Sequence, residues 1–435
     1  STAASTADTS TAASTEASST AESDAPLEGE ITFWHSFTQG ARMEAVQKAA
    51  DKFMEANPGV KINIETYSWG DFNTKWNAGL TTGDLPDMST AQGTGEVVEM
   101  MNADVLTPID DMVDDIGRDR FSANALADMT SDGATYGVPY YSHEQVMWYR
   151  TDLLEAAGLE VPKTWDEFYD AAVTLTKDGQ YGAAFSCSPN DLLSTRYLNY
   201  YVVSAGSSLL NDDLTANLTS KEAIDGINFW LKVYKNCSPA ETINYTVNDH
   251  ATLFYQGKTA FDFNSGFMIG GVQNNTPEIA QYVRCAPLPR ITDSDPIYSA
   301  EASHIPLVVW KNAKHPEICK AFIEYLYDTD NYVEFIHSVP VGMLPALKDI
   351  ATNADYLNDD TIKEYSDCVD VIQTAVDEGH AIGFEHGPSA QASYLTSQGV
   401  IEEMFQDIIT NGTDVETAAK AAEDKLNDIF DTMIS

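Results

Sequence analysis

The order of apolar and polar residues after position 28 alternates between the period of a strand and that of a helix. A short apolar run at 31–34 predicts a buried strand, and the helix predicted over 41–56 has one apolar face. That face is formed by Val46, Ala49, Ala50 and Phe53. Asn57-Pro58-Gly59 ends the helix, and a second apolar run at 60–64 predicts the next strand.

The same alternation continues towards residue 90. A helix is predicted from about Asp71, and the turn at 83–87 leads into a third apolar run at 88–90. Repeated strand and helix units predict an α/β fold with a mostly parallel sheet, and such sheets bind ligands beyond the carboxyl ends of their strands. The residues expected at that edge are Trp34, His35, Phe37 and Gln92.

The second half of the chain is predicted to be rich in helices. Capping boxes, in which a hydroxyl residue stands three positions before a carboxylate, begin at Thr164, Thr361 and Thr413. Apolar residues recur at helical spacing in three further segments, around 221–235, 316–327 and 415–433. This spacing places Trp230, Phe322 and Phe430 in the core.

The first residues have a composition of their own. Residues 1–26 contain 21 Ser, Thr or Ala residues and no branched aliphatic or aromatic side chain. Such a tract buries too little apolar surface to offset the entropy lost on folding, so residues 1–28 are predicted to be a disordered tether. We interpret Ser1 as the start of a mature chain after processing.

Size and charge limit the classes of function. The roughly four hundred remaining residues exceed the size at which one hydrophobic core stops growing, so two lobes are expected. A net charge of −43 argues against binding to nucleic acid or to an anionic membrane surface. The five cysteines are far apart and odd in number, which predicts buried thiols and no disulfide framework. We expect neither a cofactor nor a metal ion, and no apolar run is long enough to span a bilayer.

Catalytic motifs are incomplete where they begin. His143-Glu144 starts like a zinc-protease motif, but Met147 stands where the second histidine is required. Gly257-Lys258-Thr259 resembles part of a phosphate-binding loop, but Thr252 stands where that loop needs its first glycine. The sequence alone does not exclude a pair of carboxylates for glycoside hydrolysis, such as Glu144 and Glu301, because the distance between the two groups decides their role.

Several short segments mix aromatic side chains with neutral hydrogen-bonding groups. Aromatic faces pack on the C–H faces of sugar rings, while amides and imidazoles bond the hydroxyls, so this mixture suits a carbohydrate. The residues expected to contact ligand are Trp34, His35, Phe37, Trp69, Gln92, Tyr140, Tyr141, His143, Glu144, Asn190, Asn264, Phe267, Glu301, Ser303, Phe384 and Glu385.

Seven short motifs then occur in the order of a known family. They are Ile-Thr-Phe-Trp at 31–34, FMEANPGV at 53–60, GDLPD at 83–87, GVP at 137–139 followed by WYRTDLL at 148–154, FYQGKTAF at 254–261, PLP at 287–289, and HPE at 315–317 leading into 321–323. With these motifs the chain resembles the family 1 extracellular solute-binding proteins of bacterial ABC sugar importers, the group that includes maltose-binding protein. The resemblance covers nearly all of 30–435.

The resemblance implies a two-lobed α/β fold like that of periplasmic binding proteins, with a helix-rich second lobe. It implies a 1–28 tether, a first lobe of 29–140 plus 264–306, and a second lobe of 141–263 plus 307–435. The hinge crossovers are then expected near Tyr140, Asn264 and Pro306. His143 and Glu144 match the family's polar contacts, and Phe267 stands where a tryptophan usually stacks on sugar.

The expected function is a non-catalytic receptor that closes around an oligosaccharide and delivers it to an ABC transporter. Closure needs contacts from both lobes, and we expect Trp34 and Phe267 on one side and Tyr141 and Phe384 on the other. On this expectation Trp34→Ala weakens sugar binding at least about tenfold at unchanged thermal stability. A neutral sugar predicts weak salt dependence, and strong salt dependence would indicate a uronate or a phosphorylated ligand.

Two alternatives stay open: a glycoside hydrolase or lyase, and a receptor for peptides or polyamines. The implied partners are the sugar and the membrane permease subunits, with no nucleic acid. We expect a monomeric lipoprotein outside the cell, tethered to its surface or periplasmic, which meets the membrane only through an N-terminal lipid anchor. The cysteine that carries this lipid in the family is absent from the sequence.

Overall fold

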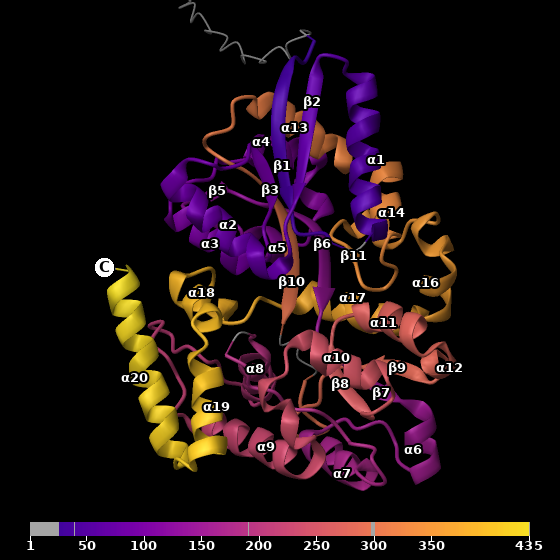
Figure 1. The fold of residues 1–435 in the computed structure, drawn as a ribbon, viewed down its shortest axis with the longest axis vertical. Coiled ribbons are helices and arrows are strands. Elements are labelled where there is room, and N and C mark those ends of the chain that lie inside the picture. The colour runs from indigo at the N-terminus through magenta and orange to yellow at the C-terminus, as the bar shows by residue number, and fades with distance from the viewer. Residues whose placement is uncertain (1–25, 39, 190, 297–300, 435) are drawn as a thin grey trace, which may run out of the picture.

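The computed structural model describes residues 26–38, 40–189, 191–296 and 301–434, so most of the predicted tether lies outside the described residues. Two sheets organise the chain, a larger one in the upper half of Figure 1 and a smaller one in the lower half. Helices surround both sheets, which gives the two-lobed α/β fold expected from the sequence. We call the larger sheet and its helices the first lobe and the smaller sheet and its helices the second lobe.

The larger sheet has six strands in the order β11-β6-β10-β3-β1-β2. Strand β1 pairs in parallel with β2 and β3, whereas β10 runs antiparallel to β3 and β6, and β11 pairs antiparallel with β6. The strand bounds are β1 Gly29–His35, β2 Val60–Thr66, β3 Met88–Thr90, β6 Val138–Glu144, β10 Ala302–Val309 and β11 Leu344–Pro345. The predicted parallel alternation is therefore confirmed for the first three strands.

Helices cover both faces of this sheet. On one face Ile31 and Phe33 of β1 pack with the buried face of α1 and with Phe322. On the other face Trp34 packs with Phe72 and Trp76 of α2 and with Trp310. The helices concerned are α1 Gly40–Ala56, α2 Trp69–Thr82, α3 Thr94–Asn102, α4 Asp110–Ile116, α13 Pro316–Leu326 and α14 Thr329–Ile336. Because successive side chains of a strand point to opposite faces, both faces of β1 are buried.

The smaller sheet has three antiparallel strands, with β7 between β8 and β9. The bounds are β7 Val146–Arg150, β8 Phe261–Asn264 and β9 Val283–Ala286. Its helices are α6 Thr151–Ala157, α7 Trp165–Leu175, α8 Leu193–Ser204, α9 Lys221–Cys237, α10 Val247–Tyr255, α11 Phe267–Asn275, α12 Pro277–Ala280, α18 Ala390–Ser397, α19 Val400–Asn411 and α20 Val415–Ile434. Trp230 and Phe430 lie in this lobe's core, as predicted.

The remaining elements are short, apart from one helix between the lobes. They are η1 Arg118–Arg120, α5 Ala123–Ala127, β4 Thr130–Ser131, β5 Ala134–Thr135, η2 Ala240–Asn244, α15 Lys348–Ala351, η3 Tyr356–Asn358, α16 Asp360–Glu364, α17 Ser366–Glu378 and η4 Phe384–His386. Helix α17 contacts β6 and β10 of the larger sheet and β9 of the smaller sheet. It lies between the two sheets in Figure 1.

The chain passes between the sheets at different places from those expected. Strand β6 belongs to the larger sheet and β7 to the smaller, so the first crossing is at Gln145, shortly after Tyr140. Strands β8 and β9 both pair with β7, so 264–286 stays with the smaller sheet and no crossing occurs at Asn264. The second crossing lies between β9 and β10, and Pro306 is inside β10. After Pro306, α13 packs on α1 and β1 of the first lobe, whereas 307 onward was expected in the second.

Two further expectations concern the cysteines and membrane-spanning segments. The five cysteines are all buried free thiols, as predicted. Within the described ranges, every helix is too short or too polar to cross a membrane.

Candidate functional site

A cavity of about 790 Å³ lies beside the first crossing of the chain and is lined from both lobes. The first lobe contributes residues after β1, on α1, on β6 and after α14, and the second lobe contributes residues of α8, α10 and α11. Among the lining residues are Ser36, Thr38, Arg42, Tyr141, His143, Ser338, Pro340, Gln145, Arg196, Asn248, Tyr255, Asn264, Ser265, Phe267, Gln273 and Asn274. Side chains of both lobes therefore line one cavity.

The wall from the first lobe is built around Arg42. Its Nη1 donates to the Tyr141 hydroxyl at 3.0 Å, and its guanidinium carbon lies 4.6 Å from the centre of the Phe37 ring. The same carbon lies 5.6 Å from the ring of Phe267 in the second lobe. Cation–π contacts of this kind hold an arginine in a fixed orientation at a largely apolar site.

The wall from the second lobe comes close to the first lobe at the start of α11. A Cβ atom on Gly266 would lie 2.1 Å from the backbone oxygen of Val341, which follows α14. A Cβ atom on Gly271 would lie 2.1 Å from the Tyr255 ring. Glycines at these two places therefore let α11 approach both α10 and the first lobe, and this brings Phe267 to the cavity.

A buried ion pair joins the second crossing to the second lobe. Nε of Arg196 lies 2.9 Å from Oε2 of Glu301, and the two side chains are only 17% and 5% exposed. Burial opposes the charge of Arg196, but Glu301, Tyr200 and Asp191 together outweigh it and raise the pKa of the guanidinium. The hydroxyls of Tyr200 and Ser303 also donate to Glu301, at 3.4 Å each. Glu301 is thus a structural counter-ion at the hinge.

His143 is a neutral group in the cavity wall. Burial, and then the positive charge of Arg196, lower its pKa to about 3. Its Nδ1 atom is buried without a hydrogen-bond partner among the described residues. A neutral imidazole of this kind suits a ligand hydroxyl or carboxylate.

Four of the predicted contact residues line the cavity: Tyr141, His143, Asn264 and Phe267. Tyr141 and His143 stand two positions apart on β6, and Tyr140 points to the other side of the strand. There Tyr140 stacks on Phe335 of α14, with 4.1 Å between ring centres. Tyr140 is therefore a core residue.

Other predicted aromatic contacts are also in cores. Trp34 is 1% exposed among Phe72, Trp76 and Trp310, because α2 covers that face of β1. Phe37 is fully buried beneath Arg42, and Phe384 is buried in the core of the second lobe. None of these three is among the described residues that line the cavity.

The predicted polar contact residues lie in several different places in the structure. His35 is buried and accepts a hydrogen bond from the Phe37 amide. Glu144 is fully buried, Gln92 is half-buried at the start of α3, and Ser303 bonds Glu301. Glu385 lies in a different surface hollow with Ser208. Asn190 and the side chain of Trp69 lie outside the described residues.

The sequence reasoning missed the two arginines of the cavity and its amides on α10 and α11. Arg42 carried a signal, since it falls on the apolar face of α1 one turn before Val46 and is only 4% exposed. A charge on the apolar face of a helix needs a buried partner or a function. No comparable pattern marks Arg196, Asn248, Gln273 or Asn274.

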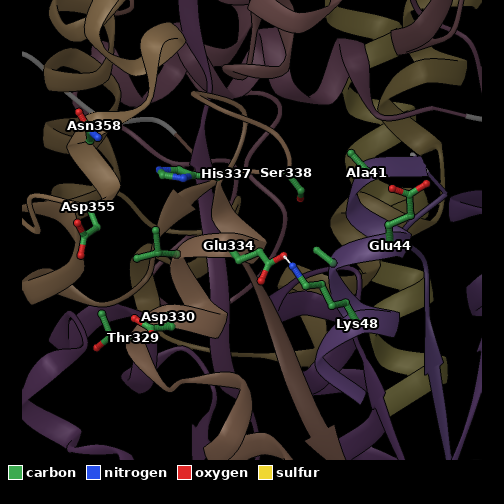
Figure 2. A pocket seen from close by; sticks show the side chains of 12 residues that line it. Ala41, Glu44, Lys48, Thr329, Asp330, Glu334, His337, Ser338, Asp355 and Asn358 are labelled. Carbon is green, nitrogen blue, oxygen red and sulfur yellow. Dashed lines mark hydrogen bonds and ion pairs between the residues drawn. The ribbon is translucent and has the colours of Figure 1, made fainter. Parts of the chain in front are cut away.

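A second cavity of about 730 Å³ adjoins the first between α1 and α14 and shares Ala41 and Ser338 with it. Figure 2 shows Lys48 of α1 facing Glu334 of α14, with an ion pair between the two side chains. This groove is a hollow of the first lobe alone, since the residues that line it lie on α1, on α14 and in the segment after α14.

Comparisons with known proteins agree with this architecture. Residues 37–333 match the family described as bacterial extracellular solute-binding protein. An arabinooligosaccharide-binding protein of Halalkalibacterium halodurans is 23% identical over 417 residues, covering 92% of this chain and 90% of that one. A maltotriose-binding protein of Pyrococcus abyssi is 23% identical over 426 residues, covering 92% and 82%.

Solved structures of similar fold cover nearly the whole chain. A solute-binding protein from Agrobacterium radiobacter in complex with ribitol has a TM-score of 0.78 at 19% identity, covering 93% of this chain and 100% of that one. One from Thermotoga lettingae bound with α-D-tagatose has a TM-score of 0.77 at 22% identity, covering 92% and 99%. By its fold, its inter-lobe cavity and the match over most of its length, the chain belongs to the bacterial extracellular solute-binding proteins.

Proposed function

We propose that this protein is a carbohydrate receptor that closes around an oligosaccharide and delivers it to an ABC importer. The observation that carries the proposal is the inter-lobe cavity, whose aromatic rings and neutral hydrogen-bonding groups come from both lobes. Tyr141 stands on the first lobe and Phe267 and Tyr255 on the second. Names of relatives that refer to arabinooligosaccharides and maltotriose support a sugar as the ligand.

Closure follows from the two-sided lining. A ligand that bound one lobe alone would have equal affinity for the open and closed forms and would shift no equilibrium. A sugar that contacts Tyr141 and Phe267 together favours the closed form. The closed form is then the state that the membrane permease subunits recognise.

A glycoside hydrolase is disfavoured by the state of its candidate acids. Glu301 is paired with Arg196, and Glu144 is fully buried with Oε1 accepting from the Gln145 amide. Neither carboxylate is among the described residues that line the cavity. We therefore propose a receptor without catalytic activity.

The setting of the receptor is also part of the proposal. Its family is extracellular, and the Ser, Thr and Ala composition of the first residues suits a spacer between a membrane anchor and the folded lobes. We propose a monomer held at the cell surface through a lipid anchor. The net charge of −43 disfavours nucleic acid as a partner.

Phe267→Ala tests the aromatic contact. We expect the variant to bind the sugar about tenfold more weakly, because it loses both the stacking and the buried area of the ring. A screen of oligosaccharides by thermal shift identifies the sugar, since a ligand that binds only the folded state raises the melting temperature. Calorimetry then measures the affinity.

The matched control is Tyr282→Ala, which truncates a ring that is 39% exposed and does not line the cavity. We expect this variant to bind with the affinity of the parent. Equal affinity of Phe267→Ala and the parent would contradict the role of Phe267, and shortening of the oligosaccharide on overnight incubation would contradict a receptor without activity.

A further inference from the structure

The inter-lobe cavity differs in charge from the rest of the molecule. The chain has 67 acidic and 24 basic residues. The described residues that line the cavity nevertheless include no aspartate or glutamate, and they include Arg42, Arg196 and His143. This cavity therefore lacks the excess of carboxylates that the chain has as a whole. The charge of Arg196 is paired with Glu301, which is not among the described lining residues, and His143 is neutral.

Other hollows of the same chain serve as a comparison. The groove between α1 and α14, which adjoins the inter-lobe cavity, is lined by Glu44, Asp330, Glu334 and Asp355 (Figure 2). Two more hollows of the second lobe each have three carboxylates, namely Asp212, Asp213 and Glu385 in one and Glu222, Asp225 and Asp295 in the other. Of these four hollows, only the cavity between the lobes has no carboxylate among its described lining residues.

The two arginines reach this cavity from opposite lobes. Arg42 lies on α1 of the first lobe and Arg196 on α8 of the second. After burial, the charges of both arginines contribute to the lowered pKa of His143, which places both within electrostatic range of that side chain. Arg42 is oriented by the neutral Tyr141 hydroxyl and by ring faces, and Arg196 by Glu301.

We propose that the ligand is an acid sugar, whose anionic group binds between Arg42 and Arg196. This rests on the proposed carbohydrate function and narrows its ligand class. The planar guanidinium matches the two oxygens of a uronate carboxylate or of a phosphate ester, and such charge-assisted hydrogen bonds are stronger than neutral ones. An anion held by one arginine from each lobe binds the closed form more tightly than the open form, so it also favours closure.

The two arginines also argue against a positively charged ligand. A polyamine or a basic peptide would meet two guanidinium groups in a cavity without a described carboxylate. The guanidinium groups would repel a positively charged ligand, and the repulsion is strongest where water is excluded. The acidic outer surface therefore does not indicate a cationic ligand.

The test compares sugars that differ only in charge. The probes are a xylo-oligosaccharide that carries glucuronic acid, the same xylo-oligosaccharide without it, trigalacturonate, and phosphorylated and free forms of one disaccharide, within a wider glycan array. We expect acid sugars to bind at least about tenfold more tightly than their neutral counterparts at low salt. We expect this preference to shrink severalfold at about 0.5 M salt because the ions screen the charges.

Each outcome separates the two proposals. Preference for the uronate or for the phosphate identifies the anionic group and supports the inference. Binding of neutral glycans alone, without salt dependence, overturns the inference and leaves the carbohydrate receptor standing. Binding of no glycan of either class overturns both.

Variants locate the charge contact. Arg42→Gln is expected to weaken binding of acid sugars at least about tenfold and to remove most of the salt dependence. Tyr141→Phe removes the same hydrogen bond but keeps the charge, so it should weaken acid and neutral sugars alike and keep the preference. The double variant Arg196→Gln/Glu301→Gln removes the second arginine without leaving its counter-ion unpaired. Should Arg42→Gln not fold, the salt dependence of the parent protein decides the question.

Discussion

Trp34→Ala is expected to lower the free energy of unfolding by about 3–5 kcal/mol and to leave the sugar affinity of the folded protein unchanged. The indole is 1% exposed and packs with Phe72, Trp76 and Trp310. Its removal leaves a cavity in a close-packed core, which costs more than the transfer of the ring alone. Urea denaturation measures the stability, and calorimetry at a temperature where the variant is folded measures the affinity.

Trp34→Phe is the matched control. The indole Nε1 is buried without a hydrogen-bond partner among the described residues, so phenylalanine leaves no polar group newly unpaired. We expect a loss smaller than that of the alanine variant. A Trp34→Ala protein with unchanged stability and tenfold weaker sugar binding would show that Trp34 contacts the sugar, as the sequence alone suggested.

Arg196→Met is expected to destabilise the protein by about 3–5 kcal/mol. Glu301 would keep its charge in a site where its side chain is 5% exposed, and it would lose the nearest cation. The neutral donors Tyr200 and Ser303, each at 3.4 Å, compensate for little of that loss. The change in denaturation midpoint at constant slope gives the magnitude.

The double variant Arg196→Met/Glu301→Gln shows whether the unpaired charge is the cause. It removes both charges, and we expect it to recover most of the lost stability, since a buried ion pair contributes little net stability over neutral groups of similar size. A double variant as unstable as the single one would show that Arg196 contributes through packing, and the proposed counter-ion role of Glu301 would be wrong.

Local signals in the sequence predicted the first three strands and the helices between them. The helix end at Ala56 follows from Asn57-Pro58-Gly59, and the buried face of α1 is the one that its periodicity indicates. Asp87, in the turn that leads into β3, accepts hydrogen bonds from the amides of Thr32 and Lys314. The capping box at Thr164 is present, whereas Asp359 and Asp414 cap the helices predicted to start at Thr361 and Thr413.

The features that the sequence did not predict depend on contacts between segments that are far apart in the chain. Helices cover both faces of the larger sheet, so β1 and β6 have no alternation of polarity that separates Trp34 or Tyr140 from residues of the site. The lobe boundaries depend on which strands pair. The pairing of β9 with β7, and of β10 with β3 and β6, joins segments more than a hundred residues apart. Short apolar runs carry no information on their partners.

The aromatic pattern in the sequence indicated some residues of the site and missed others. Tyr141 and Phe267 line the cavity, but so do Arg42 and Arg196, which belong to no aromatic pattern. A net charge of −43 describes the molecule as a whole and does not reveal a local pair of arginines. Composition describes the surface as a whole, and the arrangement of two helices from different lobes decides the field within the cavity.

Hydrogen exchange of the parent protein, with and without its sugar, tests most directly whether the ligand is held by both lobes. The account predicts slower amide exchange on binding in two separate segments, the one around Thr38 and Arg42 and the one from Asn264 to Asn274, which form opposite walls of the cavity. Protection confined to one of these walls, or found only elsewhere, would contradict a ligand enclosed between the lobes.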